Sequence, residues 1–186
     1  QNLLSQTIIV IAADHGEGLG ERGGFGHFSL HIENTHVPLV VWIPGVRGIR
    51  VEVPVSTVYA LPWILGHSSL PVGALARERS QTVLLPVIEA LGGAGTVVSE
   101  FVGFQSMRAA ITTPDLRMIH DLETGWTEVY DRRQDPTETR DLSVATPPVR
   151  ETVSPIVAKY LALRGTLHGY RLDPSARQAE PGLAQP

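Results

Sequence analysis

Asp14 and His15 are neighbours at the end of an uncharged, mostly apolar segment, and both carry side chains that bind divalent cations. A carboxylate oxygen favours calcium or magnesium, whereas an imidazole nitrogen admits manganese or zinc more readily. Adjacent side chains of an extended strand point to opposite faces, so both can reach one ion only if the chain turns there. Gly16 follows directly and permits such a turn. On these residues alone, a strand-ending turn that binds no metal is the common interpretation, and a metal site at the end of a strand is the alternative that the flanking motifs come to favour.

The segment before this pair is expected to be a strand. Residues 7–13 are mostly apolar and β-branched, and they form a continuous run rather than an alternating one. That pattern is typical of a strand buried on both faces of a parallel sheet. Ligands of open α/β sheets gather beyond the carboxyl ends of such strands. We therefore expect Asp14 and His15 to lie at the ligand-binding edge of an α/β sheet.

A glycine-rich segment follows the pair. Six glycines occur between residues 16 and 26, a density that predicts an open loop rather than a helix or a strand. Such a loop lets the backbone approach a small ligand closely. His27 follows the last of these glycines, and Glu17 near the start of the loop is interpreted as a helix-start or turn acid, with a further site residue as the alternative.

Three further elements are predicted before residue 66. Residues 30–33 favour a short helical turn, and residues 37–43 predict a second buried strand, which ends at Pro44 and Gly45. Residues 56–65 favour a helix, because Ser56 is a good N-cap residue and apolar residues recur behind it at helical spacing. Pro62 indicates that this helix is short or kinked.

From residue 96 the pattern changes to short β-prone segments separated by turn signals. Four of them predict an antiparallel meander, and Pro155 opens a predicted closing helix over residues 155–163. The last residues are rich in Pro, Ala, Gln and charge, which predicts a disordered tail. We thus expect an α/β core with the metal motif in residues 1–95, an antiparallel β subdomain plus helix in residues 96–165, and the tail in residues 166–186. The predicted strands are residues 96–102, 107–112, 116–122 and 127–131.

Composition argues against several classes of function. The 186 residues contain no cysteine, so they form no disulfide and no thiolate metal cluster. The net charge of −4 and the scattered basic residues predict no nucleic-acid groove. The longest apolar stretches are too short to cross a bilayer, so no membrane contact is predicted for this segment. The chain opens without Met and soon enters a strand, which favours a fragment of a longer protein.

Three motifs span most of the chain up to residue 142. Residues 14–27 contain Asp-His-Gly-Glu-x-Leu-Gly-Glu-x-Gly followed by Gly-His, and residues 33–45 contain Glu-Asn-Thr-His-Val-Pro-Leu-Val-Val followed by Pro-Gly. Residues 128–142 contain Glu-Val-Tyr-Asp and then Asp-Pro-x-Glu-x-x-Asp-Leu. In type, order and approximate spacing these motifs resemble those of the sulfatase family in the alkaline-phosphatase-like superfamily.

The resemblance implies a fold and a site. The fold is the C-terminal part of an alkaline-phosphatase-like α/β sandwich, followed by a small antiparallel sheet subdomain with a closing helix. Asp14 and His15 match the family's second pair of metal ligands, for Ca²⁺ first and for Mn²⁺ or Mg²⁺ as alternatives. His27 matches a position where the family places a Lys or His that contacts the transferred group. A protonated imidazole there would bind a peripheral oxygen or protonate the leaving group; a solvated loop residue is the alternative.

The implied activity is metal-dependent hydrolysis of sulfate esters of a small molecule or glycan. One alternative is a phosphoryl-transferring relative that acts on phosphorylated substrates: a phosphonate monoester hydrolase, a phosphodiesterase or a phosphoethanolamine transferase. Another is a non-catalytic remnant of the fold. The resemblance is compatible with a periplasmic, extracellular or membrane-anchored protein. Arg22, Tyr59 and Trp63 depart from the residues common in the family, and none of them belongs to the metal pair.

The family's nucleophile lies in a Cys/Ser-x-Pro-x-Arg segment, whose Cys or Ser becomes formylglycine. No such segment occurs in residues 1–186, so formylglycine is expected in an upstream part. Residues 146–150 read Thr-Pro-Pro-Val-Arg, but they follow the Asp-Pro-x-Glu motif and are interpreted as a linker. We predict that the isolated fragment is inactive, because two metal ligands without a nucleophile cannot complete the reaction centre.

Overall fold

The computed structural model describes residues 3–60, 64, 95–103, 106–144 and 147–168, without the side chains of 147–153 and 165–168. In these residues the strands form three antiparallel sheets, β1–β4, β2–β3 and β5–β6–β7–β8. The elements in chain order are η1 (Leu3–Gln6), β1 (Ile9–Ala12), β2 (Gly18–Leu19), η2 (Glu21–Gly23), β3 (Phe25–Gly26), α1 (Ile32–Thr35), β4 (Leu39–Trp42), η3 (Thr57–Tyr59), β5 (Val97–Gly103), β6 (Ser106–Thr112), β7 (Leu116–Asp121), β8 (Thr127–Asp131) and α5 (Pro147–His168), where η marks a 3₁₀ helix.

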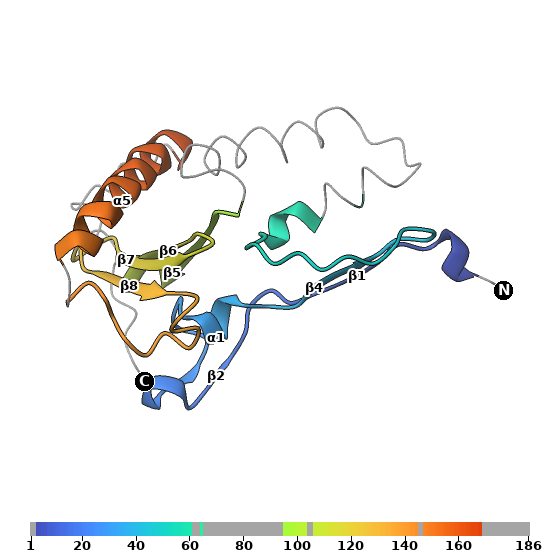
Figure 1. Ribbon diagram of the computed structural model, residues 1–186, viewed down its shortest axis with the longest axis horizontal. Helices are drawn as coiled ribbons and strands as arrows, with labels where there is room; N and C mark the ends of the chain where they lie inside the picture. Colours follow the sequence, from blue (N-terminus) through green and yellow to red (C-terminus); the bar gives the residue numbers. More distant parts are fainter. Residues whose placement is uncertain (1–2, 61–63, 65–94, 104–105, 145–146, 169–186) are drawn as a thin grey trace, which may run out of the picture.

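The four-stranded sheet is a meander in which each strand pairs with the next (Figure 1). Its bounds differ from the four predicted segments by no more than one residue at either end. The predicted antiparallel meander is therefore confirmed. The turn between β6 and β7 is closed by Thr113, whose N–H donates to the Leu116 carbonyl at 2.8 Å. The turn between β7 and β8 is held by Asp121, whose Oδ1 accepts from two backbone N–H groups at 2.9 and 3.0 Å.

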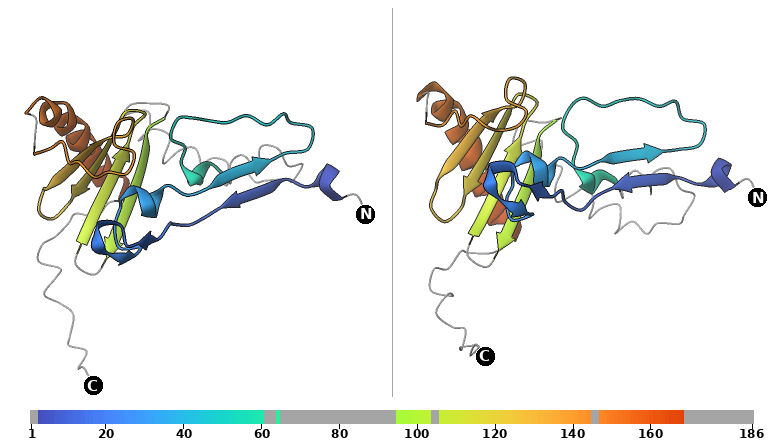
Figure 2. Two further views of the ribbon diagram at one scale, coloured as in Figure 1. Left: turned by 60° about the horizontal axis from the view of Figure 1, so that its bottom comes forward. Right: turned by 90° about the horizontal axis from the view of Figure 1, so that it is seen from below.

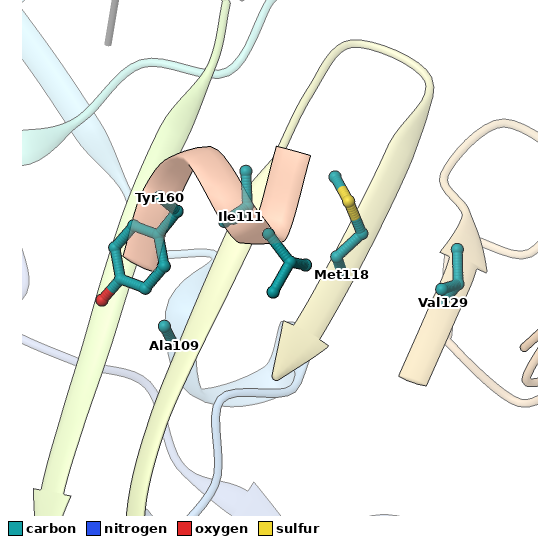
Figure 3. Close-up of a cluster of buried hydrophobic side chains, with 6 residues drawn as sticks. Ala109, Ile111, Met118, Val129 and Tyr160 are labelled. Carbon is teal, nitrogen blue, oxygen red and sulfur yellow. The ribbon is translucent and has the colours of Figure 1, made fainter. Parts of the chain in front are cut away.

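Helix α5 covers one face of this sheet (Figure 3). Alternate residues of a strand point to opposite faces, so Ala109 and Ile111 of β6 share the face that meets the helix. They form one buried cluster with Tyr160 of α5 and with residues of β7 and β8. The Tyr160 hydroxyl also donates to the Glu100 carboxylate of β5. The remaining members of the cluster are Met118, Val129 and Val157.

The closing helix begins earlier than predicted, at Pro147 rather than at Pro155. Two consecutive prolines open it, which the first turn tolerates because its N–H groups have no partner inside the helix. Pro155 lies inside the helix and is exposed to solvent. It lacks the N–H of one helical hydrogen bond, so packing of Val157 and Tyr160 against the sheet must offset that loss.

The opposite face of the sheet is covered by the chain around α1. Leu30, just before α1, packs with Ala110, Ile119 and Tyr130 in a second buried cluster. Figure 1 shows α5 and α1 on opposite sides of the sheet. The buried Arg117 of β7 donates to the Leu30 carbonyl and so ties the two layers together. This contact brings the glycine-rich segment next to the meander.

The first two predicted strands form a two-stranded antiparallel ribbon, not part of a parallel sheet (Figures 1 and 2). Ile9 pairs with Trp42 and Ile11 with Val40, and all four side chains are exposed. The expectation of a parallel strand buried on both faces is therefore wrong for the part of the chain that is described. The physical reason is where the connection lies: the glycine-rich segment and α1 both form beyond the end of β1, so the chain enters β4 beside Ala12, with Leu39 as its partner, and runs back along β1.

The glycine-rich segment is also more ordered than the predicted open loop. Gly18 pairs with Gly26 and Leu19 with Phe25, and η2 forms the tip between the two short strands. Gly20 and Gly23 have φ values of 121° and 73°, which suit glycine and allow so tight a hairpin. The segment is therefore a small hairpin.

Other predictions have mixed outcomes. The short helical turn is confirmed as α1, which begins and ends two residues later than expected. Ser56 caps η3, since its side-chain oxygen accepts from the Val58 N–H at 3.4 Å, as the sequence predicts. Most of the predicted helix beyond residue 60, position 146 of the Thr-Pro-Pro-Val-Arg segment and the tail from residue 169 lie outside the described residues.

None of the helices that the structure describes has the length and apolar character needed to cross a bilayer.

Candidate metal centre and its glycine-rich hairpin

Asp14 and His15 follow the end of β1, and their side chains face each other. Asp14 Oδ2 lies 3.7 Å from His15 Nε2, while Asp14 Oδ1 accepts from the His15 backbone N–H at 3.0 Å. The Asp14 side chain is 88% exposed. The neighbouring backbone N–H of His15 lowers the pKa of the Asp14 carboxyl below its ordinary value, and the His15 ring adds to this effect. Asp14 is thus an ionised carboxylate at neutral pH, with one oxygen directed at an imidazole nitrogen.

The His15 ring is oriented by the backbone. Its Nδ1 lies 2.8 Å from the Gly16 carbonyl oxygen. Because a carbonyl can only accept, Nδ1 carries the proton, and the lone pair of a neutral ring is on Nε2. Metal-binding histidines commonly donate the other ring N–H to a backbone carbonyl in this way, which fixes the tautomer and the orientation of the ring. The nitrogen that faces Asp14 is therefore the one free to bind a cation.

Gly16 is needed for a close backbone approach. Its N–H donates to the Asn34 carbonyl of α1 at 2.8 Å. A Cβ at this position would lie 2.0 Å from the Glu33 carbonyl oxygen. That distance is too short for any residue with a side chain. The requirement for glycine therefore comes from the packing of the Asp14–His15 turn against α1.

His27 lies beside His15, twelve residues away in sequence. The two rings stack with centroids 4.3 Å apart, and the Phe28 ring also stacks on His27, with centroids 5.0 Å apart. His27 Nδ1 lies 3.1 Å from the Glu17 carboxylate, which can only accept when ionised, so Nδ1 is again the donor. The His27 Nε2 is then available to a ligand. The structure brings Asp14, His15 and His27, the three predicted site residues, into one group.

The donor set suits a divalent cation. Ligand bonds of 2.0–2.6 Å separate neighbouring ligand atoms by about 3–3.7 Å, and the Asp14–His15 distance falls at the upper end of that range. A second grouping overlaps with the first: His15, Glu17 and His27 each offer a ligand atom, and these atoms lie within 4.8 Å of one another. Both groupings share His15, so a single ion beside that ring would meet carboxylate and imidazole donors.

Glu17 lies in the candidate site, a position that its interpretation as a turn acid did not predict. Interpreted as a turn acid, it instead contacts His27 across the hairpin. A glutamate two residues after a candidate ligand is a weak signal, and only the pairing of Gly18 with Gly26 brings residues 17 and 27 side by side. No periodicity in the sequence predicts that pairing.

The family model and the relatives described here all point to the same protein family. Residues 1–70 match the Sulfatase family model. Human arylsulfatase K is 34% identical over 87 residues, which cover 46% of this chain and 16% of the human protein. A Delta 4,5-hexuronate-2-O-sulfatase from Bacteroides thetaiotaomicron is 31% identical over 155 residues, which cover 74% of this chain and 30% of that protein. The chain thus spans less than a third of the length of either relative.

Solved structures agree on the fold. A 2-O GAG sulfatase superposes with a TM-score of 0.62 at 22% identity, covering 96% of this chain and 42% of the other. A protein solved with its substrate D-glucosamine-2-N,6-O-disulfate gives a TM-score of 0.65 at 22% identity, covering 93% of this chain and 36% of the other. With its mixed α/β architecture, small antiparallel sheets and motifs, the chain belongs to the sulfatase family and has its alkaline-phosphatase-like fold.

Proposed function

We propose that this chain contributes metal ligands and a substrate contact to the active site of a metal-dependent sulfatase. Asp14 and His15 would hold the cation, with Ca²⁺ favoured and Mn²⁺ or Mg²⁺ as alternatives. The observation that carries this proposal is the 3.7 Å approach of Asp14 Oδ2 to His15 Nε2, with Nδ1 of the same ring committed to the Gly16 carbonyl. In that arrangement the charged Asp14 Oδ2 and the lone pair of His15 Nε2 face the same point, where a cation would bind.

The residues of the site have complementary roles in hydrolysis of a sulfate ester. A bound cation would neutralise negative charge on the transferred group. Asp14 supplies the negative charge that retains the cation, and His15 binds as the neutral imidazole. With Glu17 accepting from its Nδ1, a His27 ring that is also protonated on Nε2 would donate from Nε2 a hydrogen bond to a sulfate oxygen or a proton to the leaving group.

The substrate that we infer is a sulfated sugar. Two relatives have names or titles that concern sulfated carbohydrates: a Delta 4,5-hexuronate-2-O-sulfatase and a protein bound to D-glucosamine-2-N,6-O-disulfate. In this chain Phe28 stacks on His27 and remains largely exposed. An exposed aromatic ring next to a sulfate-binding side chain suits the apolar face of a pyranose ring.

We further propose that the nucleophile is a formylglycine supplied by sequence outside these 186 residues. Residues 1–186 contain no Cys/Ser-x-Pro-x-Arg segment. The matched relatives are more than three times as long as the part that aligns. Residues 1–186 would accordingly work within a longer chain that completes the reaction centre.

The test is Asp14→Ala in the full-length protein, assayed for bound metal and for hydrolysis of an aryl sulfate and an aryl phosphonate. We expect bound metal to fall and kcat for the aryl sulfate to drop at least about 100-fold. Asp115→Ala is the matched control, since Asp115 is an exposed carboxylate paired with Arg133 at 2.7 Å. Unchanged metal content and turnover in Asp14→Ala would refute the proposal, and a wild-type preference for the phosphonate would favour the phosphoryl-transferring alternative.

A further inference from the structure

Two residues share an uncommon backbone conformation and contact each other. Arg22 in η2 and Glu138 after β8 both have φ of 55°, and they are the only non-glycine residues with positive φ among those described. Arg22 Nη2 donates to the Glu138 carbonyl at 2.9 Å. A non-glycine residue in this region is held there at an energetic cost, and such residues cluster where position matters for function.

The guanidinium of Arg22 links three separate segments. Its Nη1 lies 2.6 Å from both carboxylate oxygens of Glu33 in α1. Its Nη2 donates to the Thr137 and Glu138 carbonyls, each at 2.9 Å. A planar guanidinium offers several donors in a fixed geometry, so it holds orientation in a way that an ammonium cannot. Arg22 therefore fastens the tip of the hairpin to α1 and to the segment after β8.

Glu138 gives this attachment a rigid base. Its side chain is only 2% exposed, and its carboxylate accepts from the Ile32 N–H at 3.0 Å, at the start of α1. The same carboxylate lies 2.9 Å from Arg117 Nε of β7 and 3.2 Å from His31 Nδ1. Both Arg117 and Glu138 are buried, so their separation would leave an uncompensated charge. The anchor for Arg22 is thus part of the packed sheet.

The hairpin needs such an anchor. β2 and β3 pair through only two residue pairs, and an isolated ribbon of that size is not stable in water. Glu17 immediately precedes β2 and His27 immediately follows β3. A shift of the hairpin would therefore move both side chains relative to His15.

We propose that Arg22 is a positioning residue: by clamping η2 to Glu33 and to the Thr137–Glu138 backbone, it holds Glu17 and His27 beside His15. This role rests on the proposed function of His27. The clamp joins residues 116 positions apart, so the C-terminal meander sets the geometry of the N-terminal site. Because the Arg22 guanidinium contacts Glu33 and the Thr137–Glu138 backbone rather than His15 or His27, its effect on turnover is indirect.

The first test is kinetic and uses Arg22→Ala, Arg22→Lys and the control Arg133→Gln in the full-length protein. We expect Arg22→Ala to lower kcat for an aryl sulfate about 10- to 100-fold with a smaller change in KM, because misplacing a reacting group acts mainly on the transition state. Arg22→Lys should recover little, and free guanidinium ion should partly rescue Arg22→Ala. Arg133→Gln removes an exposed ion pair and should leave kcat unchanged. Unaltered kcat in Arg22→Ala would overturn the inference.

The second test does not depend on turnover. Hydrogen–deuterium exchange of peptides covering residues 16–27 should accelerate in Arg22→Ala, while exchange in β5–β8 stays as in the wild type. The same acceleration is expected for Glu33→Gln, which keeps the shape of the carboxylate but loses its charge. Unchanged exchange in the hairpin, or a uniform increase that includes β5–β8, would overturn the positioning role. If exchange responds as expected and the wild type hydrolyses no sulfate ester, the clamp stands and the proposed function fails.

Discussion

His15 is fixed by two contacts that both involve the next residue. Its Nδ1 donates to the Gly16 carbonyl at 2.8 Å, and the Gly16 N–H in turn donates to the Asn34 carbonyl at 2.8 Å. The direction of the His15 Nε2 lone pair is therefore set by how closely the backbone at Gly16 packs on α1. Gly16, which has no side chain, thus controls the orientation of the His15 ring.

Gly16→Ala tests this dependence. The added Cβ would lie 2.0 Å from the Glu33 carbonyl oxygen, so the Asp14–His15 turn must move away from α1. We expect the free energy of unfolding to fall by about 1–3 kcal/mol, and metal affinity of the full-length protein to fall as well. Urea denaturation and metal titration measure the two effects. Gly48→Ala is the control, because a Cβ there meets nothing within 4 Å; equal behaviour of the two variants would contradict the argument.

Strand β7 shows how an element can bury polar groups when each is paired. Arg117, Met118, Ile119 and His120 are all buried, and the two polar members have partners on neighbouring segments. His120 Nδ1 lies 2.8 Å from the Thr127 hydroxyl of β8. Burial lowers the pKa of His120, and the adjacent Asp121 carboxylate opposes that effect only in part. The imidazole is therefore neutral in the folded sheet at pH 7.

The stability of the sheet should depend on pH through His120. Since the folded pKa is lower than the unfolded value of about 6.5, the contribution to stability is complete above that pH and is lost as pH falls through the folded pKa. His120→Asn retains a partner for Thr127 but cannot titrate, so its free energy of unfolding should fall less between about pH 7 and pH 5. Urea denaturation across this range measures the slope. His36→Asn, at an exposed histidine, is the control; identical slopes for wild type and His120→Asn would be inconsistent with this view.

At the scale of the whole molecule, the described chain combines a packed sheet with an unpacked ribbon. The meander is covered on one face by α5 and on the other by the chain around α1. The β1–β4 ribbon instead exposes Ile9, Ile11, Val40 and Trp42 on one face. Contiguous exposed apolar side chains mark a surface that associates with other protein. In the proposed longer chain, that surface would be covered by the rest of the α/β core.

Residues 1–186 on their own should therefore be inactive and prone to self-association. They carry Asp14, His15 and His27 but no Cys/Ser-x-Pro-x-Arg segment, so a reaction centre cannot be completed. The measurement is aryl sulfate hydrolysis by the purified segment, with light scattering to follow association. The full-length protein is the positive control. Sulfatase turnover by the segment alone would show that the proposed division of the active site is wrong.

The sequence by itself determined the local features. The strands of the meander are bounded by turn residues such as Thr113 and Asp121, whose hydrogen bonds reach only two or three residues away. Adjacent Asp14 and His15, followed by Gly16, likewise form a candidate metal pair whatever the rest of the chain does. Such interactions lie within a few residues, so residue type and spacing are enough to predict them.

Only the tertiary structure decided the distant contacts. In the folded chain, β1 pairs with an antiparallel strand, α5 continues through Pro155, and Glu17 contacts His27. The fold also brings Arg22 to Glu138, 116 residues away. These contacts depend on which surfaces meet after the chain has turned and packed. Charged residues that are buried between two layers produce no periodic pattern in the sequence. For that reason the candidate ligands could be named from the sequence, whereas the contacts that orient and hold their side chains could not.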